Sequence, residues 1–415
     1  MRLKTPTGSR LKIVTGSASI LLLTVAAASA QLAVSANDGK VKLVDGVVQA
    51  VKEGKDTVAF IDMKASPPKI LATIEAPSSV VGPPTSVAVS PKEEIALITA
   101  AQKIDPADAT KLVWDDKLTV VDLTPLKTSL SKRLLDSVRR APAAAAMPPK
   151  ILATLTVGKG AAGVSFNKAG TLALVANRGE GTISVLTIEG NKVAVAGKVD
   201  LGNDKAGPSA VSFLPDGKSA LVTLDGESAN KIIVLDVDGA KVSVSKREIS
   251  AGLRPYGLDI AKNGEFAVVA NIGRGGGDND TISLIDLKTL PARVVNTITV
   301  GQTPEGIKLS PDGTMVAVGL ANGSNKPKAS PFFHDNGLVK LFRISGSKLT
   351  QTGEVAVGQW CQGLAWSANG KTLFEQCMVG EEIHILKVGN GNSGALTNVG
   401  TIKVQGGPAG IRTAE

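Results

Sequence analysis

His334 is the residue whose type and setting come closest to general-base chemistry near neutral pH. It stands in the segment Phe332–Asp335, where Asp335 could orient the imidazole. The other histidine, His384, falls inside a predicted strand, where a packed structural role is expected. Two histidines cannot supply a spaced metal triad, and no Gly-x-Ser-x-Gly motif marks a nucleophile. We therefore expect a surface histidine, with a catalytic base as the alternative.

Arginine, carboxylate and aromatic side chains in the predicted loops are a second group of candidates. They could bind a small anionic ligand, although each one alone is expected to be an ordinary loop residue. Asn271 ends a predicted strand, as Asn37 and Asn177 do, so we expect it to bond nearby backbone. The candidates for a ligand-binding face are Arg178, Arg254, Tyr256, Asn271, Arg274, Glu305, His334, Asp335 and Trp360.

The glycine-rich loop Gly275–Asp280 could hold calcium through its oxygen atoms. A solvated hairpin tip is the favoured interpretation, and the sequence predicts no metal site. No cofactor is predicted either, because no Cys-x-x-Cys-His motif occurs and only His334 is placed to serve as an axial haem ligand.

The elements that must position these residues follow a repeat, which is clearest between Arg254 and Val300. Short apolar runs separated by Asn-Gly or Asp-Gly turns are typical of antiparallel strands joined by hairpins. Four such strands in under 50 residues predict one blade of a β-propeller. The third strand recurs seven times, at Asp56–Asp62, Lys117–Leu123, Gly181–Ile188, Lys231–Val237, Thr281–Leu287, Gly337–Ile344 and Glu382–Val388.

The two ends of the chain complete this pattern. Pro408–Thr413 matches a first strand with nothing after it, and Leu32–Asn37 matches a second strand with nothing before it. One blade assembled from both ends would close the ring and remove its sheet edges. The sequence therefore predicts an all-β, seven-bladed propeller of four-stranded antiparallel blades over residues 31–415.

The repeats resemble the YVTN family of propeller proteins. The resemblance rests on Leu174–Asn177, Val268–Asn271, the Ser-Pro-Asp-Gly turn at Ser310–Gly313, and closing Val-Gly pairs such as the one ending at Gly301. It covers nearly all of the chain after residue 30. It implies a fold similar to lactonase propellers, the amine dehydrogenase heavy subunit and the haem-binding propeller of nitrite reductase. Fold analogy alone does not choose among these functions.

The propeller model also predicts where charges inside the blades would meet. Glu375 takes the place that valine holds in other blades, such as Val175 and Val269, and a buried carboxylate needs compensation. We expect an internal ion-pair network, with a charged site at the channel mouth as the alternative. The members of this channel network would be Asp259, Lys308, Glu375 and Arg412.

Two kinds of loop share one face of a propeller: those joining strands two and three, and those joining strand four to the next strand one. Most of the length variation falls in the first kind, so the ligand is expected on this face. An insertion at 124–150 in blade two lies elsewhere. Its segment Ser129–Val138 predicts a short amphipathic helix packed on the opposite face, with a partner-docking arm as the alternative.

The first 30 residues resemble a secretory signal that is cut before Gln31. Four basic residues precede a short apolar run, Ile20–Ala28, and a small-x-small end. An uncleaved anchor is the alternative, although the apolar run is short for a membrane span. Removal of the four cations lowers the net charge from +9 to +5. This mild excess contains no long basic run, and aromatic residues are 3% of the chain, so nucleic-acid binding is disfavoured.

Cys361 and Cys377 are the only cysteines. If the turn at 368–370 pairs Ser367 with Lys371, then Cys361 faces Cys377 on the neighbouring strand. Opposed cysteines in an exported protein favour a disulfide, and a register shift of one residue would rule it out.

These features predict a monomeric periplasmic propeller that binds a small molecule or an envelope protein, with no membrane span once the signal is removed. A lactonase-like hydrolase that acts on a small anionic lactone, with Glu305 and His334 taking part, is the first alternative. A redox accessory propeller is the second.

Overall fold

The computed structural model describes residues 31–130, 147–226, 229–389 and 394–414. The predicted signal segment lies outside these residues. So does most of the predicted helix Ser129–Val138, but residues 124–130 are helical and bury Leu126. No helix within the described ranges is long and apolar enough to cross a membrane.

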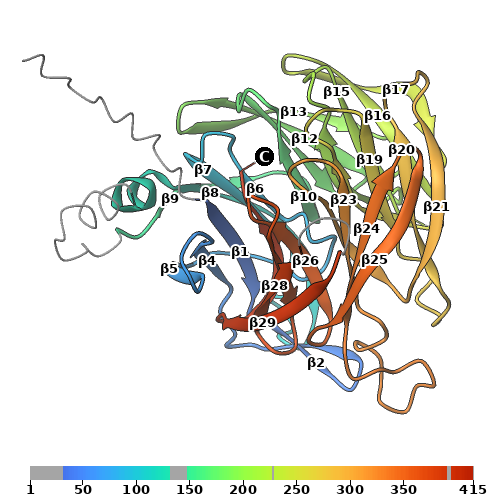
Figure 1. Ribbon diagram of the computed structural model, residues 1–415. Coiled ribbons are helices and arrows are strands. Elements are labelled where there is room, and N and C mark those ends of the chain that lie inside the picture. The colour runs from blue at the N-terminus through green and yellow to red at the C-terminus, as the bar shows by residue number, and fades with distance from the viewer. Residues whose placement is uncertain (1–30, 131–146, 227–228, 390–393, 415) are drawn as a thin grey trace, which may run out of the picture.

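Seven four-stranded antiparallel sheets form the blades of a propeller, as the repeat predicts (Figure 1). Blade two consists of β6 (Val87–Val89), β7 (Ile95–Ile104), β8 (Leu112–Asp122) and β9 (Lys150–Thr156). Blade three consists of β10 (Ala161–Phe166), β11 (Leu172–Asn177), β12 (Thr182–Glu189) and β13 (Lys192–Asp200). Blade four consists of β14 (Pro208–Phe213), β15 (Ser219–Leu224), β16 (Lys231–Asp238) and β17 (Lys241–Ile249). Blade five consists of β18 (Pro255–Ile260), β19 (Phe266–Asn271), β20 (Asp280–Asp286) and β21 (Arg293–Gly301). Blade six consists of β22 (Pro304–Leu309), β23 (Met315–Leu320), β24 (Leu338–Ser345) and β25 (Lys348–Ala356). Blade seven consists of β26 (Cys361–Trp366), β27 (Thr372–Cys377), β28 (Glu382–Val388) and β29 (Leu396–Lys403).

Blade one joins the two ends of the described chain. Its strands are, in order, β30 (Gly407–Arg412), β1 (Leu32–Asp38), β4 (Thr57–Asp62) and β5 (Lys69–Glu75). Figure 1 shows the blue N-terminal strands beside the red C-terminal ones. The predicted closure by a shared blade is therefore confirmed, and the edges that an open ring would expose are paired instead.

The first strand of each blade is the innermost, and these seven strands form a closed ring. Neighbouring first strands contact each other all the way round, and β30 contacts both β26 and β6. The hydrophobic core lies between blades. One cluster, for example, packs Val268 and Leu284 of blade five against Ile307 and Val316 of blade six. Alternating side chains on each blade therefore fill the two interfaces with its neighbours.

A β-bulge interrupts the first hairpin of most blades, and it corrects the predicted register of the cysteine hairpin. The turn pairs Ser367 with Thr372 rather than with Lys371, so the strands are offset by one residue near the turn. A shift between Cys361 and Leu364 then restores the pairing of the two cysteines. Equivalent bulges occur in blades three to six, so the device belongs to the repeat.

Two of the long loops on the predicted ligand face contain regular structure. In blade one, β2 (Val41–Val44) and β3 (Val47–Ala50) form a separate hairpin. In blade two, β7 and β8 extend past the body of the blade as a paired ribbon. The loops of blades five and six are irregular.

Candidate functional site

Asp225 is the centre of a charged cluster at the predicted ligand face, where the second strand of blade four ends. Arg178, from the same place in blade three, donates two hydrogen bonds of 2.5 and 2.8 Å to its two carboxylate oxygens. Arg254 of blade five donates a third, of 3.1 Å, and Ser209 donates one of 2.9 Å. Three blades are thus joined through one carboxylate, which is 1% exposed.

Tyr256 and Glu305 continue this cluster along the first strands of blades five and six. The guanidinium of Arg178 lies over the Tyr256 ring, 5.5 Å from its centre. Burial raises the pKa of Tyr256, so the phenol keeps its proton at neutral pH. Burial also raises the pKa of Glu305 to about 7, although the 2.8 Å hydrogen bond from Gln362 Nε2 and the charge of Arg178 both favour the ionised form. We call this end of the channel the arginine mouth.

Glu375 is fully buried between blades six and seven. Neither of its carboxylate oxygens has a hydrogen-bond partner within the described residues. Burial, together with repulsion from Glu305, raises the pKa of this carboxyl well above its ordinary value and favours the neutral acid. Glycine at 319 makes the space, because a Cβ there would lie 2.4 Å from Glu375 Oε1.

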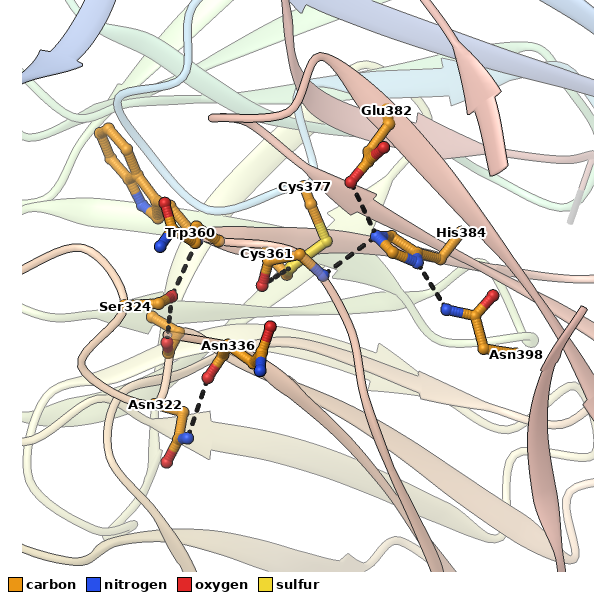
Figure 2. The surroundings of a disulfide bond; sticks show 12 residues. Asn322, Ser324, Asn336, Trp360, Cys361, Cys377, Glu382, His384 and Asn398 are labelled. Atoms are coloured by element: carbon orange, nitrogen blue, oxygen red, sulfur yellow. Dashed lines mark hydrogen bonds and ion pairs between the residues drawn. A yellow bond between two sulfur atoms is a disulfide. The ribbon is translucent and has the colours of Figure 1, made fainter. Parts of the chain in front are cut away.

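The disulfide lies beside the arginine mouth and confirms the predicted cysteine pairing. It joins Cys361 and Cys377, whose Cα atoms are 3.9 Å apart, on the two inner strands of blade seven. Figure 2 shows Trp360 and His384 on either side of it. The backbone N–H of Trp360 donates to Ser324 Oγ at 2.9 Å, and His384 Nε2 accepts from the N–H of Gly358 at 3.0 Å. The cross-link therefore holds the strand that carries Trp360 and Gln362.

Arg254 and Trp360 both occupy a backbone conformation that favours glycine. Their φ angles are 54° and 48°, and Gly160 and Gly207 take positive φ just before the first strand of blades three and four. A non-glycine residue in this region costs on the order of 1 kcal/mol, and such residues cluster at functional sites. Thr303 takes the same conformation, with φ of 52°, just before the first strand of blade six, so the conformation belongs to the repeat.

The remaining residues predicted for the ligand face do not join this cluster. His334 and Asp335 are exposed, and His334 Nδ1 lies 3.0 Å from the carbonyl oxygen of Asn322 rather than against Asp335. Arg274 is exposed in the loop after β19. Asn271 accepts the N–H of Gly252 at 3.1 Å and donates to two hydroxyl groups, which is a structural role.

The predicted channel network is divided between the two ends of the channel. Lys308 Nζ lies 2.8 Å from Asp259 Oδ1, and Asp259 Oδ2 also accepts the N–H of Leu309. Arg412 is buried near the same end and donates to the carbonyl of Ile411. Glu375 instead lies near Glu305, so it does not share their site.

In the glycine-rich loop, Asp280 accepts the N–H of Thr303 at 2.8 Å, and burial raises its pKa to about 6. The described part of the chain holds no group of three or more histidine, cysteine, aspartate and glutamate residues that could bind a metal.

Sequence reasoning missed Asp225 and Ser209. One signal could have found the aspartate: Asp225 directly follows the second strand of its blade, as Arg178 does in the preceding blade. Opposite charges at the same repeat position of adjacent blades are placed to meet across the interface.

Comparison with known proteins finds fold relatives. A candidate 6-phosphogluconolactonase from Bacteroides fragilis superimposes with a TM-score of 0.66 at 17% identity, over 94% of this chain and 99% of that one. The periplasmic gluconolactonase PpgL of Pseudomonas aeruginosa has a TM-score of 0.65 at 14% identity, over 93% and 99%. Hydrazine synthase of Kuenenia stuttgartiensis has a TM-score of 0.53 at 18% identity, over 75% and 78%.

The likeness is one of fold. No family model matches the sequence, and no curated protein matches it either. The chain is a seven-bladed propeller whose structural neighbours include lactonase-like propellers and hydrazine synthase. At these identities the arrangement of the blades is shared, and the chemistry has to be argued from this chain's own residues.

Proposed function

We propose that this protein binds a small organic anion at the arginine mouth. The observation that carries the proposal is the convergence of Arg178 and Arg254 on the single carboxylate of Asp225. Their side chains stay 18% and 34% exposed, so part of each guanidinium remains accessible from the mouth. Two arginine side chains meet one aspartate carboxylate here, so the cluster holds one more cation than anion when Glu305 is protonated. A bound carboxylate would balance the second cation through charge-assisted hydrogen bonds.

Neighbouring groups would select the ligand. Tyr256, held below Arg178, would donate its hydroxyl hydrogen, and the apolar face of Trp360 packs with Val80 and Ala409 at the same end. A polyhydroxylated acid would use both kinds of surface, with hydroxyl groups toward the tyrosine and carbon–hydrogen faces toward the indole.

Hydrolysis of a lactone is the second candidate, and Glu305 favours it. A carboxyl whose pKa is about 7 can both accept and donate a proton at neutral pH. In this proposal Glu305 takes a proton from water as the water oxygen attacks the lactone carbonyl. An arginine stabilises the oxyanion. When the ring C–O bond breaks, the leaving oxygen receives the proton from Glu305, and a hydroxy acid is released.

The proposal includes export. The disulfide is expected to persist in an oxidising compartment such as the periplasm, which agrees with the predicted signal segment. A periplasmic protein partner, the other ligand class predicted from the sequence, would have to use the outer loops of the same face.

Calorimetric titration with gluconate and glucono-1,5-lactone tests the binding proposal. We expect Arg254→Gln to weaken gluconate binding by about tenfold or more. Arg247→Gln, which removes an exposed arginine from β17, is the matched control and should bind as the unmodified protein does. Failure of the unmodified protein to bind either compound, or equal losses in both variants, would overturn the proposal.

Lactone opening followed by pH-stat titration separates the two candidates. Glu305→Gln should abolish turnover while keeping gluconate affinity within about twofold, since the hydrogen bond with Gln362 can persist. Absence of turnover in the unmodified protein, with gluconate binding intact, leaves the binding role and removes the hydrolase.

A further inference from the structure

The end of the channel opposite the arginine mouth contains two adjoining cavities of about 360 and 660 Å³. They share Pro91, Ile260, Ala261 and Lys262, so they lie side by side in one hollow region. The turns between the first and second strands of blades two to seven surround it, together with the end of β30 in blade one. Even the smaller cavity by itself has the usual volume of a small-molecule site.

An apolar ring lines this hollow. Each first strand ends here, and in six of the seven blades its last residue is apolar. In blade one the last residue of β30 is Arg412, which lines the smaller cavity, and Thr413 just past it lines the larger one. The apolar members of the ring are Val89, Phe166, Phe213, Ile260, Leu309 and Trp366.

Cations surround the ring. Lys168, Lys262 and Arg412 line the smaller cavity, and its described lining contains no carboxylate. Lys168 and Lys262 are exposed at turns of blades three and five, at the outer edge. The larger cavity adds lysines of its own, and these are partly balanced by Glu93, Glu94 and Asp259. We call this end the lysine mouth.

We propose that the lysine mouth binds an amphiphilic anion: a small molecule with an extended or flat apolar body and one anionic head group. The body packs against Phe213, Ile260 and Phe166 in the smaller cavity. The head group remains at the outer edge, near Lys168 and Lys262, where water still solvates it. Burial of an apolar chain supplies the affinity at about 25 cal/mol per Å² of surface, and the lysines select the charge.

The physical basis for this ligand class is an apolar interior beside the two exposed lysines Lys168 and Lys262, in a smaller cavity whose described lining contains no carboxylate. A purely polar anion would leave the apolar ring facing water, and a neutral hydrocarbon would not use the lysines. This site shares no residue with the arginine mouth, so the inference stands independently of the proposed function.

Calorimetric titration of the full chain with laurate, below its micelle concentration, tests the proposal. We expect saturable binding of one laurate per chain. Butyrate should bind at least about tenfold more weakly because it fills less of the apolar cavity. Dodecanol should also bind more weakly than laurate, because it lacks the charge. Equal affinity for laurate and butyrate, or for laurate and dodecanol, would overturn the proposal.

Charge-reversed variants locate the site. Lys168→Glu with Lys262→Glu should lower laurate affinity by about tenfold or more. The matched control is Lys192→Glu with Lys241→Glu, which makes the same charge change at exposed positions on the outer hairpins of the same face. Circular dichroism melts confirm that both variants fold. No laurate binding by the unmodified protein, or equal losses in the two pairs, would overturn the assignment.

Discussion

The two mouths of the channel are built from the same seven strands and differ in where they put their charges. At the arginine mouth, the second position of successive first strands holds Tyr256, Glu305 and Gln362, and two partly exposed arginines bond to the buried Asp225. At the lysine mouth, the last position of the first strand is apolar in six blades, Lys168 and Lys262 lie exposed on the turns, and one buried ion pair joins Lys308 to Asp259. One repeat therefore supports two chemistries at its two ends.

The contrast teaches how a propeller keeps a buried charge. At the arginine mouth each ionised group is shared between blades, and Asp225 accepts hydrogen bonds from residues of three blades. At the lysine mouth water solvates the exposed lysines directly. Loss of the Asp225 carboxylate should therefore have a large effect on stability, and loss of the exposed Lys168 or Lys262 a small one.

The largest expected effect is from Asp225→Ala. Removal of this carboxylate leaves two arginines without their buried partner, and the free energy of unfolding should fall by about 3–5 kcal/mol. Urea unfolding measures it. The control Asp236→Ala breaks the exposed pair with Arg247, whose distance is also 2.5 Å, and should cost less than about 1 kcal/mol. If both variants lost a similar free energy of unfolding, the buried Asp225 would contribute no more to stability than the exposed Asp236.

Replacement of the buried Glu305 by glutamine should change how stability depends on pH. Its carboxyl is protonated below the ordinary pKa of 4.5 in both states, so it contributes nothing there. As the pH rises from 4.5 to about 7, the folded state holds the proton while the unfolded state releases it, and stability falls. Glu305→Gln should remove this loss, which amounts to about 3 kcal/mol.

Unfolding curves at several pH values between 4 and 8 make this comparison. The control is Glu354→Gln, which changes an exposed carboxylate on β25 and should run parallel to the unmodified protein across the window. A Glu305→Gln curve that also runs parallel would show that the Glu305 carboxyl titrates normally.

Loss of the disulfide should weaken the arginine mouth more than the lysine mouth. Cys361→Ser with Cys377→Ser should lower the free energy of unfolding by about 3 kcal/mol on the chain-entropy model. Because the bond holds the strand of Trp360 and Gln362, gluconate binding should fall as well, while laurate binding at the other mouth stays within about twofold. Equal losses of both ligands would show a general effect on the fold.

The smallest expected effect is at the lysine mouth. Trp366→Phe keeps an aromatic side chain among the apolar residues that line this mouth. It removes the 3.2 Å hydrogen bond from the indole N–H to the carbonyl of Lys308. Stability should fall by about 1 kcal/mol, and laurate affinity should change little. A loss as large as that of Asp225→Ala in thermal unfolding would mean that this mouth also depends on buried polar bonds.

The sequence predicted the blades, their order and the closing blade because four-strand repeats with glycine turns carry a strong local pattern. It predicted the cysteine pairing but not the bulge that achieves it. Among the predicted ligand-face residues, Arg178, Arg254, Tyr256 and Glu305 lie together, whereas His334 lies apart. The reason is that loop conformation depends on contacts outside the repeat, such as the bond between His334 and the Asn322 carbonyl.

The amino-acid sequence by itself determined that this chain alternates apolar and polar residues with the period of a strand, and that its two ends complete one sheet. Only the tertiary structure decided that Asp225 receives two arginines from neighbouring blades, that Glu375 lies over Gly319, and that apolar strand ends gather around one mouth. These contacts join residues that are far apart in sequence, so they depend on the angle and register at which the blades pack. A local sequence pattern does not predict that angle or register.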